Sequence, residues 1–109
     1  MDPLPTDPDL AFAQKTLKTF IAPDGSFRAI PAQQKKLLVL LRHCLQAFAP
    51  GQRYTEPEVN AILLRYHPDT AFLRRSLIVH RMMDREGGGA AYWRIDDSVG
   101  DDNGDQTGR

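Results

Sequence analysis

Two helix-start signals stand close together in the chain and restrict its fold more than any other feature. Thr55, followed three residues later by Glu58, forms the pattern of a capping box. In such a box the threonine oxygen accepts a hydrogen bond from the third helical amide, and the glutamate reaches back to the amide of the cap. Pro68 ends the helix that Thr55 caps, because proline disfavours helical backbone at the residue before it. Asp69 can then cap a new helix. The sequence therefore predicts two short helices joined by a tight turn, the second running from Thr70 to about Asp84.

A glycine-tipped hairpin is predicted directly after these two helices. The triple glycine at 87 to 89 supplies a turn, and in residues 90 to 95 apolar side chains alternate with Tyr92 and Arg94, as expected for a strand that returns from a short hairpin. Tyr54, which precedes the capping box, can serve as a further strand of one or two residues.

Helical patterns also precede this pair of helices. Apolar residues at helical spacing predict a first helix from about Pro8 to Ile21 and a second, central helix that opens at Pro31 and ends at Pro50-Gly51. The predicted fold is mainly α with a small β-hairpin: a winged helix-turn-helix preceded by an extra N-terminal helix. We expect a single domain over residues 8–95, a flexible N-terminus over residues 1–7 and a disordered acidic tail over residues 96–109.

Length and composition restrict the functional classes. The chain has 109 residues, enough for one domain, and its longest apolar run, at 37 to 41, is too short to span a membrane. The N-terminus is acidic and lacks the features of a secretory signal, so we expect a cytoplasmic protein without membrane contact. The net charge of zero is unevenly distributed. Residues 10 to 95 carry 13 basic and 6 acidic side chains, and this excess of seven positive charges favours a polyanionic partner.

The segment from Pro31 to Arg94 resembles a known family. It holds, in order and at compatible spacing, the motifs Tyr54-Thr55-Glu56, Glu58-Val59-Asn60, Leu73-Arg74-Arg75, Arg85 and Tyr92-Trp93-Arg94. These motifs are similar to those of the prokaryotic DUF2087 domain, which has no assigned activity and occurs alone or joined to bacterial transcriptional regulators. The resemblance therefore implies a regulatory context. The chain departs from the family pattern at Val79-His80-Arg81, where members tend to carry an acid, an aromatic residue and glycine.

Arginines on and after the predicted helix from Thr70 to about Asp84 are the candidate DNA contacts. On a helical wheel Arg74, Arg81 and Arg85 lie on one side, and we expect the side chains of Arg74 and Arg81 to be exposed. In a winged helix the second helix of the pair enters the major groove, where arginine can donate to guanine or neutralise a phosphate. Arg85 and Arg94 also flank the tip of the predicted wing. Double-stranded DNA is therefore the expected partner.

Two alternatives remain open from the sequence. Arg75 can pair with Glu56 or Glu58 and so connect the helix that starts at Thr70 to the helix before it. The remaining arginines then form only a solvent-exposed basic surface. Ile78 and Met82 fall outside the main apolar face of the helix that starts at Thr70. If they are exposed, they favour a regulatory protein or a second copy of the chain as the partner, with no DNA binding.

No catalytic or metal-binding pattern is apparent. Cys44 is the only cysteine and lies on an apolar helical stripe without a nucleophile motif, so we expect a buried, unreactive thiol. His43 points to a different side of the same helix, and His67 and His80 are not at ligand spacing with it. We therefore expect no enzymatic activity, no metal and no cofactor.

Overall fold

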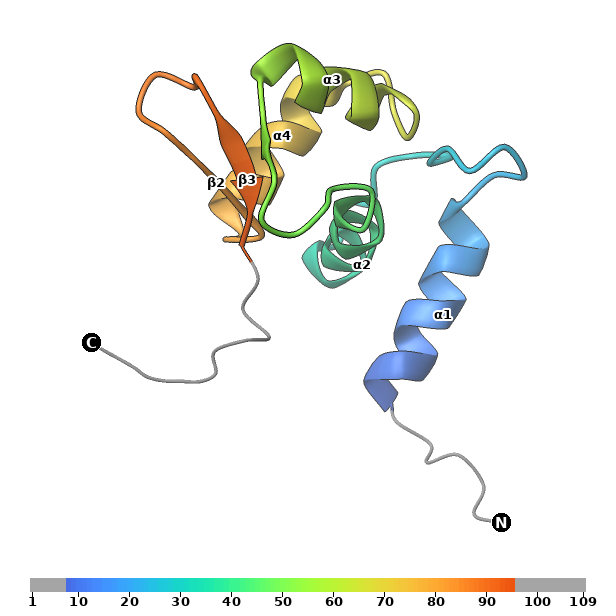
Figure 1. The fold of residues 1–109 in the computed structure, drawn as a ribbon. Helices are drawn as coiled ribbons and strands as arrows, with labels where there is room; N and C mark the ends of the chain where they lie inside the picture. The colour runs from blue at the N-terminus through green and yellow to red at the C-terminus, as the bar shows by residue number, and fades with distance from the viewer. Residues whose placement is uncertain (1–7, 96–109) are drawn as a thin grey trace.

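The structure, a computed structural model, describes residues 8–95 as four helices and a small antiparallel sheet (Figure 1). In chain order the elements are α1 (Pro8–Phe20), α2 (Gln34–Leu45), β1 (Arg53–Tyr54), α3 (Glu56–Leu64), α4 (Thr70–Val79), β2 (Met83–Arg85) and β3 (Tyr92–Arg94). The predicted mainly α class is confirmed, and β1 adds a third strand to the hairpin. The expectations for the N-terminus (1–7) and the acidic tail (96–109) concern segments outside the described residues.

Helices α3 and α4 begin at the caps that the sequence predicted. The Thr55 hydroxyl accepts from the Glu58 amide at 3.2 Å, and the Glu58 carboxylate accepts from the Thr55 amide at 2.8 Å, so the capping box is complete. At the start of α4, the Asp69 carboxylate accepts from the Phe72 amide at 3.1 Å. These bonds satisfy amide groups that have no partner inside the first turn of a helix.

Helix α4 ends at Val79, which makes the predicted end near Asp84 wrong. The Met82 amide donates to the Leu77 carbonyl at 2.9 Å, and the Arg81 amide donates to the Ile78 carbonyl at 3.0 Å. Arg81 has a φ of 62°, in the left-handed region. Together these features form a Schellman motif, which closes a helix. The sequence did not reveal it because an arginine occupies the position where glycine is usual.

Helix α2 also begins later than predicted. Instead of opening at Pro31, it starts at Gln34, and the Gln33 carbonyl accepts its first hydrogen bonds. The backbone at Gln33 is extended and Pro31 lies in the non-helical segment before it, so neither belongs to the helix. The helix ends at Leu45, and turns rather than further helix lead to Pro50-Gly51.

Helix α2 occupies the middle of the structure. It lies between α1 on one side and α3, α4 and the sheet on the other (Figure 1). The buried apolar side chains of these elements form one core, made of Phe27, Leu40, Leu41, Cys44, Phe48, Val59, Leu63, Leu73, Leu77, Met82, Met83 and Tyr92. Removal of this apolar surface from water is the main stabilisation of the fold.

The sheet has the strand order β1-β3-β2, with both neighbouring pairs antiparallel. Tyr92 is opposite Tyr54 on one side and Arg85 on the other, so the three side chains share one face of the sheet. Trp93 points to the opposite face, where the Arg53 guanidinium lies 4.3 Å from its ring centroid. The register therefore places Tyr92 in the core and Arg85 beside it at the edge of the sheet.

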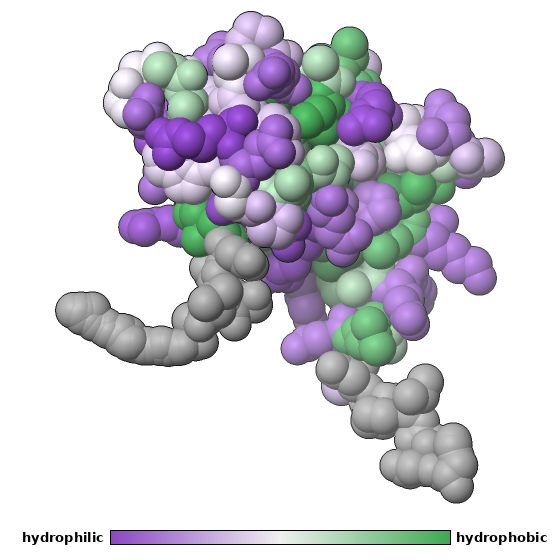
Figure 2. All heavy atoms as spheres, in the orientation of Figure 1, coloured by the Kyte–Doolittle hydropathy of each residue, from purple (hydrophilic) through white to green (hydrophobic). Residues whose placement is uncertain are grey.

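The surface mixes hydrophilic and hydrophobic side chains, as Figure 2 shows for one face. The large hydrophobic residues exposed among the described ones are Leu10, Leu64 and Val79, and the last of these is 71% exposed at the end of α4. None of the helices in residues 8–95 has the length and apolar character needed to cross a membrane.

Candidate functional site

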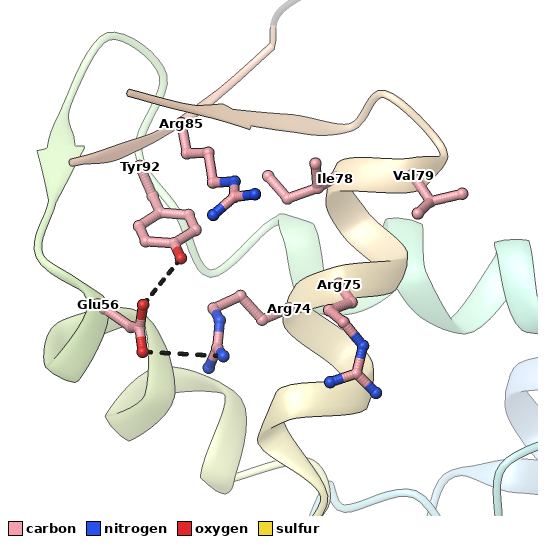
Figure 3. A pocket seen from close by; sticks show the side chains of 7 residues that line it. All are labelled: Glu56, Arg74, Arg75, Ile78, Val79, Arg85 and Tyr92. Atoms are coloured by element: carbon pink, nitrogen blue, oxygen red, sulfur yellow. Dashed lines mark hydrogen bonds and ion pairs between the residues drawn. The ribbon is translucent and has the colours of Figure 1, made fainter. Parts of the chain in front are cut away.

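A pocket of about 350 Å³ opens between the start of α3, the exposed side of α4 and the hairpin (Figure 3). Its lining contains three arginines, one glutamate, one tyrosine and two aliphatic side chains: Glu56, Arg74, Arg75, Ile78, Val79, Arg85 and Tyr92. Basic side chains from α4 and β2 thus converge on one cavity. The sequence had placed Arg74, Arg81 and Arg85 on one side of a helical wheel, which is wrong for Arg85, because α4 ends at Val79 and Arg85 belongs to β2.

Helical spacing and strand register explain this convergence. On α4 the lining residues form two pairs spaced by four positions, Arg74 with Ile78 and Arg75 with Val79. Residues at this spacing lie on the same side of a helix. From the sheet, Arg85 and Tyr92 are direct cross-strand neighbours. Their side chains therefore enter the pocket together from the side opposite α4 (Figure 3).

One wall of the pocket is a polar network around Glu56. Its Oε1 accepts a hydrogen bond of 3.0 Å from the Tyr92 hydroxyl, and its Oε2 lies 3.8 Å from Nη2 of Arg74. The Arg74 guanidinium also donates to the side-chain oxygen of Asn60. Only 18% of the Arg74 side chain is exposed, so the prediction of an exposed arginine at this position is wrong. Arg74 instead joins α4 to α3.

The two other arginines of the pocket are exposed. Within residues 8–95, neither the Arg75 nor the Arg85 guanidinium makes a hydrogen bond or an ion pair. The alternative in which Arg75 pairs with Glu56 or Glu58 is therefore wrong. Glu56 faces the neighbouring Arg74, and the Glu58 carboxylate accepts from the Thr55 amide. Two positive charges are consequently left without a partner among the described residues. In Figure 3 the Arg85 guanidinium points into the pocket beside Ile78, whereas the Arg75 guanidinium points away from it along the other side of α4.

Gly89, near the tip of the hairpin, approaches this network closely. It has a φ of 77°, in the region that favours glycine, and a Cβ at this position would lie 3.3 Å both from Oε1 of Glu56 and from the Tyr92 hydroxyl oxygen. The glycine therefore allows the hairpin backbone to cover the Glu56–Tyr92 bond. The sequence identified the glycine turn but could not show this approach.

The remaining predicted contacts lie elsewhere. Arg81 is exposed in the left-handed turn after α4. Arg94 is opposite Met83, at the end of the hairpin away from the glycines, and it donates to the Phe48 carbonyl at 3.1 Å, so its predicted place beside the tip is wrong. Met82 is only 8% exposed, which makes the expectation of an exposed side chain wrong as well. The Schellman motif explains this, because the residue after the left-handed position commonly packs back on the helix.

Cys44 is fully buried, as predicted, and its thiol donates to the Leu41 carbonyl at 3.4 Å. Burial raises the pKa of the thiol to about 12, because the thiolate is poorly solvated in the core. In the part of the chain that the structure describes, no three histidine, cysteine, aspartate or glutamate side chains come together in a way that could hold a metal ion.

Comparison with known proteins gives one match. Residues 26–94 match the sequence model of a family described as "Uncharacterized protein conserved in bacteria (DUF2087)". The matched segment contains every lining residue of the pocket. Neither a curated protein nor a solved structure matches the chain.

Proposed function

The chain belongs to the DUF2087 family of bacterial proteins, and we propose that it is a winged helix-turn-helix module that binds double-stranded DNA in transcriptional regulation. The proposed contacts are the three exposed arginines on α4, on the turn after it and on β2: Arg75, Arg81 and Arg85. The single observation that carries the proposal is that the exposed guanidinium groups of Arg75, on α4, and Arg85, on β2, make no hydrogen bond or ion pair within residues 8–95.

The order of elements supports the winged-helix assignment. From α2 onward the chain runs helix, strand, helix, helix, strand, strand, with the last two strands joined as a hairpin and the first pairing to the last. In this arrangement α3 and α4 are the helix-turn-helix pair, the hairpin is the wing, and α1 is the additional N-terminal helix. The second helix of such a pair commonly lies in the major groove.

Charge and backbone geometry support the choice of residues. Residues 10 to 95 carry an excess of seven positive charges, which attracts a polyanion irrespective of its sequence. Arg81 is the one described residue other than glycine with a positive φ, and unfavourable backbone of this kind is often retained where a side chain has a function. Arg74 and Arg94 are no longer proposed as contacts, because both side chains bond to other parts of the protein.

The test is a fluorescence anisotropy titration of a labelled random duplex with the full chain over a range of salt concentrations. We expect the affinity to fall with salt, with a logarithmic slope of about 0.9 for each phosphate contact. Alanine at Arg75, Arg81 and Arg85 together should weaken binding and flatten the slope by up to about 3. The matched control replaces three exposed basic residues on α1 and the segment after it, Lys15, Lys18 and Arg28, and removes the same charge.

Two results would contradict the proposal. Absence of binding at about 50 mM salt, where attraction between basic protein and duplex is strong, excludes a DNA-binding function of this surface. Equal losses in the two triple variants would show that net charge rather than this surface determines the affinity.

The second candidate is a protein-interaction domain of the same fold, which the exposure of Val79 favours. This side chain is 71% exposed and lies next to the half-buried Ile78 at the pocket. If the surface binds a second copy of the chain, Val79→Asp should abolish self-association in sedimentation velocity. If the native chain sediments as a monomer, self-association through this surface is excluded.

A further inference from the structure

We propose that the pocket between α3, α4 and the hairpin is a binding site for a small organic anion, with a carboxylate held by Arg85 and an apolar body packed on Ile78 and Val79. The site does not require that the protein bind DNA. Its volume of about 350 Å³ lies within the range of small-molecule pockets, near the lower limit.

The charge of the pocket favours a monoanion. Glu56 and Arg74 face each other across 3.8 Å and offset each other, which leaves the Arg85 guanidinium as the one excess charge directed into the pocket (Figure 3). A planar guanidinium matches a carboxylate well, because it can donate two parallel hydrogen bonds. A phosphate dianion suits the site less well, since the Glu56 carboxylate in the wall repels additional negative charge.

The aliphatic part of the pocket requires an apolar ligand body. In Figure 3 the Ile78 side chain lies next to the Arg85 guanidinium, and Val79 follows at the end of the helix. Val79 is 71% exposed, so an apolar group placed against it removes hydrophobic surface from water. Inorganic ions cannot provide this contact. The arrangement therefore distinguishes an organic acid from an inorganic anion of similar charge.

The wall of the pocket is held in place before any ligand binds. Tyr92 is 2% exposed and donates to Glu56, and the backbone at Gly89 packs against both groups. Arg74 connects the same carboxylate to Asn60. A site whose walls are fixed by such contacts loses little conformational freedom on binding, which favours measurable affinity for a small ligand.

The experiment is an NMR titration of the full chain with 1-naphthoate and with octanoate, without DNA. The controls are 1-naphthamide, which has the same apolar body without the charge, and inorganic phosphate. We expect both carboxylates to bind saturably and to shift the amide signals of Ile78, Arg85 and Gly89. Naphthamide and phosphate should bind about tenfold more weakly or not at all.

A pair of variants localises the binding. Arg85→Gln should weaken naphthoate binding by about tenfold, as expected for loss of one charge-assisted hydrogen-bonding group. Arg81→Gln removes the same charge from an exposed position outside the pocket lining and should leave the binding unchanged. Both arginine side chains lack partners among the described residues, so both variants should fold, which thermal unfolding verifies.

Three results would overturn the proposal: a dissociation constant weaker than about 1 mM for both carboxylates, equal binding of naphthoate and naphthamide, or equal effects of the two variants. Because the titration contains no DNA, failure of DNA binding leaves this proposal standing, and failure of carboxylate binding leaves the DNA proposal standing.

Discussion

The hydroxyl of Tyr92 donates a hydrogen bond of 3.0 Å to Oε1 of Glu56 and so joins strand β3 to the first residue of α3, 36 positions earlier in the chain. The tyrosine is almost completely buried, and the glutamate is the residue directly after the capping threonine. The bond therefore connects the hairpin to the helix pair at the position where the pocket forms.

Removal of this hydroxyl tests the connection. We expect Tyr92→Phe to lower the free energy of unfolding by about 1 kcal/mol, because one hydrogen bond is lost while the ring remains in the core. Urea denaturation measures the change. Tyr66→Phe is the control, since the half-buried Tyr66 packs its ring on Phe27 and its hydroxyl has no hydrogen-bond partner within residues 8–95. Equal stability losses in the two variants would show that the Tyr92 hydroxyl contributes nothing specific.

Arg74 is expected to be a stabilising residue, which differs from the expectation drawn from the sequence. Arg74→Met retains the aliphatic part of the side chain but removes the hydrogen bond to Asn60 and the contact with Glu56. We expect a loss of about 1 kcal/mol, mainly from the hydrogen bond, because Glu56 is too exposed for the ion pair to contribute much. The neighbouring Arg75→Met should change the stability by less than about 0.5 kcal/mol. The reverse order in chemical denaturation would contradict the role given to Arg74.

Local signals in the sequence predicted local structure well. The helix caps at Thr55 and Asp69 are predicted from residues next to each other in the sequence, and both form in the structure. The end of α4 was missed because its stop depends on a left-handed Arg81, and arginine carries no local signal for that conformation.

The pocket could not be predicted, for a related reason. Its shape depends on contacts between residues far apart in the chain, above all the approach of Gly89 to Glu56. Hydrophobic periodicity identifies which side chains face the core, but it does not show which polar groups meet at the surface. The sequence nevertheless identified Arg85 and Ile78 as candidate contacts, and both line the pocket.

The left-handed backbone at Arg81 has a measurable consequence. A residue with a Cβ in this region is unfavourable by about 1–2 kcal/mol, and glycine avoids this cost but loses more conformational entropy on folding. We therefore expect Arg81→Gly to raise the free energy of unfolding by about 0.5–1 kcal/mol, whereas Arg81→Ala should not raise it. The two variants remove the same charge, so urea denaturation of both isolates the backbone effect. A glycine variant no more stable than the alanine variant would exclude strain at this position.

The buried thiol of Cys44 predicts a specific dependence of stability on pH. Burial raises its pKa from the ordinary value of 9.0 to about 12. Below pH 9.0 the thiol is protonated in both the folded and the unfolded chain, and its contribution to stability is fully present. As the pH rises from 9.0 towards 12, the unfolded chain releases the proton while the folded chain retains it, so the stability should fall by at most about 1.4 kcal/mol per pH unit from this group.

Comparison with Cys44→Ala isolates this effect from the other groups that titrate in the same range. The alanine variant should be less stable than the native chain at neutral pH because of the cavity, but the difference between the two should shrink as the pH rises above 9.0. Denaturation curves at several pH values measure this difference. Iodoacetamide should also modify the thiol slowly in the native chain and rapidly in denaturant, because only the unfolded chain exposes it and allows it to ionise. Parallel pH profiles for the two chains, together with rapid modification of the native thiol, would contradict the buried position of Cys44.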